Sequence, residues 1–151
     1  MQPIKHFYDH DGEHVATVLL ESNQGLITVI WQGSINEVYY VQCVMDYVLQ
    51  CTQQMGIDHW LWDLTQVRYA IDGAPNLIIQ SLENTKVYRQ VRQCAFISKR
   101  DDNPHRRKIT QSLAEQGVEV RLFATQVKAL DWLLVPDVQD TVWEKAPERQ
   151  F

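Results

Sequence analysis

The basic side chains of this chain gather in one short stretch, and their spacing suits the binding of an anion. Residues 86–108 carry eight of the 14 Lys and Arg residues and only two acidic ones. Asn103 is expected to cap a helix whose first turn holds three cationic or titratable side chains. Cations there oppose the helix dipole, whereas a bound anion would draw free N–H groups and cations together. The candidate ligand site comprises Lys99, Arg100, Asn103, His105, Arg106 and Arg107.

Two alternatives to this anion site stay open on the sequence alone. Asp101 and Asp102 lie just before the cap and can offset the same charges, which would leave an ordinary solvated face. The stretch could also dock an acidic protein partner. The position of the helix start, after a short apolar strand, favours a ligand because open α/β sheets bind ligands at the carboxyl ends of their strands.

Three histidines, at positions 6, 10 and 14, recur every four residues with acidic residues between them. On a helix they would stack and could hold a metal ion. Asp11-Gly12 predicts a hairpin turn instead, which would place Asp9 opposite His14. We therefore interpret the segment as a polar hairpin tip and expect neither a metal nor a cofactor.

Signatures of enzyme active sites are missing from the chain, so no catalytic residues are expected. The sequence contains no G-x-S-x-G, P-loop, G-x-G-x-x-G or H-E-x-x-H pattern. Ser98 and Lys99 are adjacent, and neighbouring side chains on a strand point to opposite faces. Trp60 and Trp62 share one face of their strand; core packing is the expected role, and a platform on which a ligand stacks is the alternative.

These residues are positioned by an expected order of β-β-α-β-α-β-α-β-α. That order predicts an α/β fold with a mixed, mostly parallel sheet and helical crossovers, in which strand 26–31 is central and strand 118–123 lies near an edge. Strands are expected at 4–10, 14–20, 26–31, 59–64, 92–97 and 118–123, and helices at 35–55, from Pro75 onward, after Asn103 as far as Gly117, and from Thr125 to 134. We expect a single domain over residues 1–134 and a short peripheral tail over 135–151.

The helix at 35–55 carries an apolar arc of about 200°, twice the width that one sheet face needs. Its expected start is a capping box formed by Ser34 and Glu37, and Gly56 ends it. The excess apolar surface predicts self-association through this helix, with the tail around Trp143 as the alternative cover. The candidate interface residues are Tyr40, Val44, Tyr47 and Cys51.

Bulk properties narrow the class of protein. The net charge of −5 argues against a general nucleic-acid binder. No run of about 18 apolar residues exists, so no membrane span is expected. The three cysteines are odd in number and form no C-x-x-C pair, which favours a reducing compartment and a cytoplasmic location.

Segment 61–67 (LWDLTQV), followed by 71–74 (IDGA) and a helix, resembles the STAS domain of the SpoIIAA-like anti-sigma-factor antagonists. The ending 117–123 (GVEVRLF), with 129–133 (ALDWL) behind it, is similar to small bacterial STAS-like proteins of no settled role. The resemblance covers residues 13–134. It implies a non-enzymatic regulatory module that binds another protein or a second copy of itself. A small-molecule module for an anion or an apolar ligand, using the helix start at 99–107, is the alternative.

The sequence departs from the resembled family at the residue that carries its regulation. In the antagonists, the Ser after the second acidic position is phosphorylated by a partner kinase. Asp63 and Asp72 match the acidic positions, but Gly73 and Ala74 stand where hydroxyls are required. The phosphorylation switch is therefore not carried over, and the two aspartates are interpreted as turn and cap residues.

Overall fold

The computed structural model describes residues 4–99 and 103–134. Its strands and helices alternate as predicted, except that three strands and not two precede the first helix. The strands are β1 (Ile4–Tyr8), β2 (His14–Glu21), β3 (Leu26–Ile35), β4 (His59–Ala70), β5 (Gln93–Ile97) and β6 (Glu119–Phe123). The helices are α1 (Val38–Met55), α2 (Gly73–Asn84), α3 (Pro104–Glu115) and α4 (Gln126–Leu134), with single 3₁₀ turns at Ser22–Gln24 and Val87–Arg89. The predicted tail, 135–151, lies outside the described residues.

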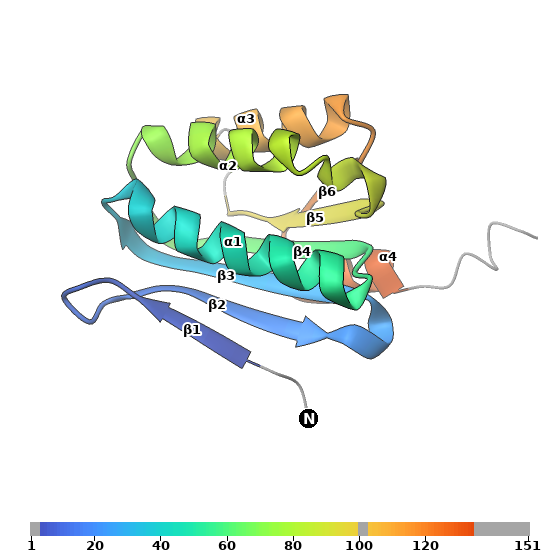
Figure 1. Ribbon diagram of the computed structural model, residues 1–151, viewed down its shortest axis with the longest axis horizontal. Coiled ribbons are helices and arrows are strands. Elements are labelled where there is room, and N and C mark those ends of the chain that lie inside the picture. The colour runs from blue at the N-terminus through green and yellow to red at the C-terminus, as the bar shows by residue number, and fades with distance from the viewer. Residues whose placement is uncertain (1–3, 100–102, 135–151) are drawn as a thin grey trace, which may run out of the picture.

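The described residues form one six-stranded sheet in the order β1-β2-β3-β4-β5-β6. β1, β2 and β3 pair antiparallel, whereas β3 to β6 pair parallel through helical crossovers. α1, α2 and α3 cover one face of the sheet and α4 lies against the other (Figure 1). The predictions of a mixed sheet, a central strand at 26–31 and an edge strand at 118–123 are therefore confirmed.

The core has two parts because the central strands are apolar on both faces. The larger part lies between the sheet and the first three helices, and it contains Trp31, Trp60, Trp62 and Phe96. The smaller part lies under α4. Its buried members are Leu26, Leu61, Ala95, Ile97, Ala129 and Leu133.

Strands β3 and β4 run farther than the sequence predicts, and α1 begins later. Ser34 pairs with Tyr69 and Ile35 with Ala70, so the expected capping box at Ser34 lies inside a strand. α1 begins at Val38, and Glu37 makes no side-chain capping bond. The predicted helix start was wrong because pairing with β4 gives the backbone N–H and C=O groups of Ser34 and Ile35 their hydrogen bonds. A capping box would have bonded only some of these groups.

Two turns also differ from expectation. Pro75 is the third residue of α2 rather than its first, because α2 begins at Gly73. At the hairpin, Tyr8 pairs with His14 across a bulge, so Asp9 does not lie opposite His14. The Asp9 carboxylate instead accepts the backbone N–H groups of residues 11 and 13 and closes the turn.

Gly33 allows the β3–β4 pairing to shift register near the carboxyl end of β3. Its φ is +68°, and a Cβ atom added there would lie 3.2 Å from the carbonyl oxygen of His14. The β3–β4 pairing shifts register on either side of Gly33. The strand therefore needs both the left-handed conformation and the absent side chain of glycine.

Neither a membrane span nor a disulfide is found in the described part of the chain. No helix there is long and apolar enough to cross a membrane. Cys43, Cys51 and Cys94 are free thiols, and burial raises the pKa of the Cys94 thiol well above its usual range. The buried thiols at 51 and 94 thus pack as small apolar side chains.

We predict that Gly33→Ala destabilises the fold more than Gly12→Ala does. Gly12 also has a positive φ of +82°, but nothing lies within 4 Å of an added Cβ atom. The left-handed conformation should cost both variants about 1 kcal/mol, and the close carbonyl should cost Gly33→Ala about 1 kcal/mol more. Urea denaturation measures the difference, and equal losses would contradict it.

Candidate functional site

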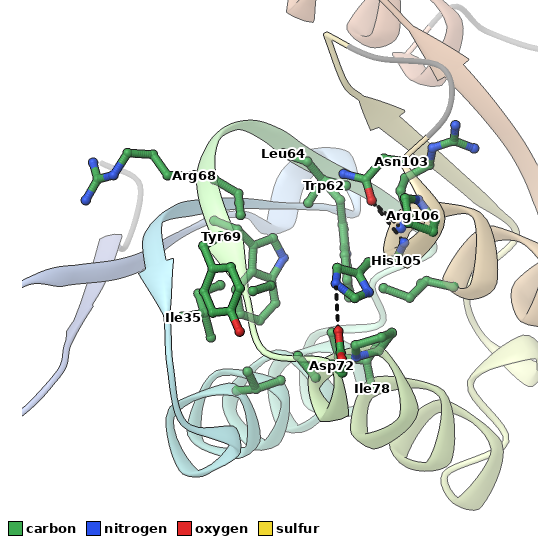
Figure 2. A pocket seen from close by; sticks show the side chains of 18 residues that line it. Ile35, Trp62, Leu64, Arg68, Tyr69, Asp72, Ile78, Asn103, His105 and Arg106 are labelled. Atoms are coloured by element: carbon green, nitrogen blue, oxygen red, sulfur yellow. Dashed lines mark hydrogen bonds and ion pairs between the residues drawn. The ribbon is translucent and has the colours of Figure 1, made fainter.

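A cavity of about 490 Å³ lies at the carboxyl ends of β3 and β4, on the face covered by α1, α2 and α3 (Figure 2). The extended ends of the two strands form one wall, and the first turns of α2 and α3 form the opposite side. Parallel strands present their carboxyl ends at one edge of the sheet, so this is where an α/β fold places ligands.

Apolar side chains make most of the cavity wall. The strands supply two tryptophans, and the helices supply aliphatic side chains and a proline. The apolar lining consists of Trp31, Ile35, Val41, Trp62, Leu64, Val67, Ala70, Ala74, Pro75, Ile78, Pro104 and Ile109. A mostly apolar lining of this kind suits an apolar molecule.

The first turn of α3 reaches the cavity with its backbone donors already used. The Asn103 side-chain oxygen accepts the N–H groups of His105 and Arg106 at 3.0 and 3.1 Å, as the predicted cap should. The Arg107 N–H donates to the Asn103 carbonyl at 3.0 Å, and Pro104 has no N–H group. The free backbone donors that the anion hypothesis invoked are therefore occupied.

Among the charged side chains that line the cavity, His105 and Asp72 lie close together, and Arg68 and Arg106 point away from them. His105 Nε2 lies 3.9 Å from the carboxylate of Asp72, which joins the starts of α2 and α3 (Figure 2). Asp72 makes no capping bond, so its predicted role as a cap was wrong. The guanidinium groups of Arg68 and Arg106 extend away from His105 and Asp72.

Two buried indole N–H groups in the lining have no acceptor among the described residues. Trp31 is 2% exposed and Trp62 is fully buried, yet neither Nε1 atom makes a hydrogen bond there. Trp60, on the same strand as Trp62, differs because its Nε1 donates to Thr52 Oγ1 at 3.1 Å. A buried donor without an acceptor costs about 1–3 kcal/mol.

The structure brings together half of the predicted ligand-binding residues. Asn103, His105 and Arg106 line the cavity, and Arg106 is buried. Lys99 and Arg107 are exposed and do not line it. The sixth predicted residue, Arg100, lies outside the described residues. The side-chain part of the anion hypothesis stays a prediction.

The predicted interface residues of α1 make contacts within the chain. Val44 and Cys51 are buried against the sheet. Tyr47 packs edge-on against Phe7 of β1, and the Tyr40 hydroxyl accepts the N–H of His10 at 2.8 Å. Most of the apolar arc is thus covered by the sheet, the β1 hairpin and α2, whereas Val38 and Met55 at the two ends of α1 stay exposed. Whether the chain associates stays a prediction.

The histidines of the hairpin surround a threonine hydroxyl instead of facing one another across a metal. His6 Nδ1 and His14 Nε2 lie 3.0 and 2.8 Å from Thr17 Oγ1. His10 lies apart, beside Tyr40. Within residues 4–99 and 103–134, no group of three or more His, Cys, Asp or Glu side chains is arranged to hold a metal ion.

Residues that the sequence analysis missed come mainly from the extended end of β4. Val67 and Tyr69 alternate with the polar Gln66 and Arg68, a pattern typical of a strand. That alternation could have extended the predicted strand to Ala70. The sequence analysis places a turn after Asp63, but β4 continues to Ala70. The Asp63 carboxylate accepts hydrogen bonds from the Thr65 N–H and hydroxyl within this strand.

We predict that Trp60→Phe destabilises the protein by about 1 kcal/mol more than Trp62→Phe. Both changes remove the same atoms from a fully buried position. Only Trp60→Phe loses a hydrogen bond, whereas Trp62→Phe removes an N–H that has no acceptor among the described residues. Urea denaturation of the two variants gives the comparison, and equal or reversed losses would contradict the assignment.

Comparisons with known proteins bear on this fold. No family model matches the chain, and no curated protein matches it. Its structure is similar to that of the anti-sigma factor antagonist SpoIIAA in its unphosphorylated form, with a TM-score of 0.57 and 12% identity over 79% of this chain and 97% of that one. It is also similar to an uncharacterized DUF3478-family protein with a SpoIIAA-like fold from Shewanella loihica PV-4, with a TM-score of 0.51 and 16% identity over 88% and 95%.

The resemblance inferred from segments 61–67 and 71–74 is thereby confirmed at the level of the fold. In the described residues, one six-stranded sheet has three helices on one face and the last helix on the other. This chain has a SpoIIAA-like, STAS-like fold.

Proposed function

We propose that this chain is a non-enzymatic regulatory module that binds a small molecule in the cavity between the ends of β3 and β4 and the starts of α2 and α3. The observation that carries the proposal is the cavity itself. Its volume of about 490 Å³ falls within the range of small-molecule sites, and its wall is mostly apolar with a few polar groups.

The arrangement of polar groups supports binding rather than catalysis. His105 and Asp72 form the titratable pair at the cavity, and Asp72 is fully exposed at its rim. The hydroxyl-bearing residue of the lining is Tyr69, which is 54% exposed. A nucleophile and its base need to meet in a desolvated position, whereas these groups lie at the edge.

A protein partner is the second candidate, and it is favoured by the structural similarity to an anti-sigma factor antagonist. Val38, Tyr39 and Tyr69 are large apolar or aromatic side chains exposed at the same end of the molecule as the cavity. Val38 lies at the start of α1, close to Gly73 at the start of α2. Exposed aromatic side chains in such a position suit a half-wet protein interface.

Self-association through this exposed end is testable without disturbing the core. Tyr39 is 65% exposed, so Tyr39→Glu should leave the fold intact. If a second copy is the partner, sedimentation velocity should show a dimer for the parent chain and a monomer for Tyr39→Glu. A dimer that survives Tyr39→Glu would exclude this surface, and a monomeric parent chain would exclude self-association.

Small-molecule binding is tested with Nile red, an uncharged dye that fluoresces in apolar surroundings. The parent chain should enhance its emission in a saturable way. Ile78 lines the cavity and is 6% exposed, so Ile78→Trp should fill the space and weaken binding about tenfold or more. Val127→Trp is the matched control, because Val127 is 70% exposed on α4.

The two variants should separate binding in the cavity from binding elsewhere. Circular dichroism establishes that each variant is folded. Undiminished Nile red binding by folded Ile78→Trp would place the dye outside the cavity and contradict the proposal. Weakened binding by Ile78→Trp, with Val127→Trp unchanged, is the expected result.

A further inference from the structure

The sheet face that carries α4 is covered over only part of its width. α4 has nine residues and packs against β4, β5 and β6. A helix with its side chains is about 10 Å wide and neighbouring strands lie about 4.8 Å apart, so one helix covers two or three strands. On the opposite face, α1, α2 and α3 share the same six strands (Figure 1). The described part of the chain packs no helix over β1 and β2 on the α4 side.

The uncovered strands are apolar at one end of this face and polar at the other. Ile4 of β1 pairs with Leu19 of β2, and Ile30 lies on the same face of β3. Ile4 is 54% exposed, and Leu19 and Ile30 are half-buried. We call these three residues the uncovered patch. A sheet face that meets water is expected to be polar, so the uncovered patch favours a cover. Toward the carboxyl end of β3 the same face carries polar side chains that bond one another, namely His6, His14, Thr17, Gln32 and Gln66.

Apolar side chains of α4 border the uncovered patch. Ala129 and Leu133 are buried against the sheet, and Leu130 and Leu134 are only partly buried. At about 100° per residue, Leu130 and Leu134 lie on one side of the buried pair and Trp132 lies on the other. Trp132 packs on an aromatic ring of β6, with the ring centroids 5.6 Å apart. The two leucines therefore face away from β6, toward the uncovered strands.

The chain beyond α4 begins close to the uncovered patch. α4 follows the carboxyl end of β6 and runs back along the sheet, and its buried residues share a core cluster with Leu26, the first residue of β3. Leu26 is next but one to the residue that pairs with Leu19. Residues 135–143 include four apolar side chains, and nine residues can span about 30 Å, whereas β1 to β3 are about 10 Å across. These apolar residues are Val135, Val138, Val142 and Trp143.

We propose that residues 135–143 cover the uncovered patch, with their apolar side chains packed on Ile4, Leu19 and Ile30. The place differs from the cover of the 35–55 helix that the sequence suggested, because α1 lies on the other face of the sheet. The proposal is independent of the cavity, which opens on the face of α1, α2 and α3.

Cysteine labelling of the full chain tests this cover. Leu19→Cys places a thiol in the uncovered patch, and a Cys43→Ser background removes the native thiol that is not buried. Modification by a water-soluble maleimide is then timed with and without Trp143→Asp. Trp143→Asp should speed the modification of Leu19→Cys about tenfold, because a charged side chain does not pack on the patch. Gln66→Cys is the matched control, since Gln66 is exposed at the polar end of the same face, and its rate should not change.

A second tail variant and the protein concentration separate the outcomes. Val138→Asp should act as Trp143→Asp does, and circular dichroism establishes that each variant is folded. If neither change speeds the modification of Leu19→Cys, residues 135–143 do not cover the patch and the proposal fails. Protection of Leu19→Cys that grows with protein concentration would assign the cover to a second copy and would also overturn the proposal. Nile red binding reports on the opposite face, so its failure leaves this test unaffected.

Discussion

The parallel pairing of β3 with β4 is the constraint on which the rest of the structure depends. The pairing runs from Leu26 opposite His59 to Ile35 opposite Ala70, so the two strands stay paired along the whole length of β3. The Ile71 N–H then donates to the Ile35 carbonyl at 2.9 Å, so the hydrogen bonds between the two segments continue almost to the start of α2. Buried backbone groups need hydrogen-bond partners, so the last residues of β3 stay extended in the sheet. For this reason α1 begins only at Val38. The same extension creates the strand wall of the cavity, and no helix covers it fully.

Most of the fold could be predicted because its signals are local and agree with one another. The apolar run of β3, the glycine at the end of α1 and the Asn103 cap each mark one element, and their order alone implies a parallel sheet with crossovers. The errors lie where a local signal competes with a tertiary one. Ser34 and Glu37 form a plausible capping box, but pairing with Tyr69 across the sheet holds Ser34 in a strand. Sequence patterns do not reveal that competition, because the partner is 35 residues away.

The position of the candidate site could be predicted from the sequence, whereas the hydrogen bonds of its donors could not. The helix start at Asn103 was correctly placed at the carboxyl edge of the sheet, and three of its predicted residues reach the cavity. The expected chemistry was that of an anion site, because a sequence shows cations and a helix start but not which N–H groups are already bonded. The tryptophans illustrate the same limit. Trp60 and Trp62 share a strand face and are equally buried, yet one has an acceptor in Thr52 and the other has none among the described residues.

The contrast between these two tryptophans also shows what a buried donor without an acceptor costs the core. Phe would fill much of the space of Trp62 without a donor to satisfy, and phenylalanine already packs beside it at Phe96. A core that is shaped only by packing gains nothing from an indole N–H that lacks an acceptor, because the donor lost its hydration on burial. Two such groups lie beside the cavity, next to a capped helix whose first-turn backbone donors are occupied. The basic stretch that dominates the sequence contributes the Asn103 cap, His105 and Arg106 to the lining of a mostly apolar cavity.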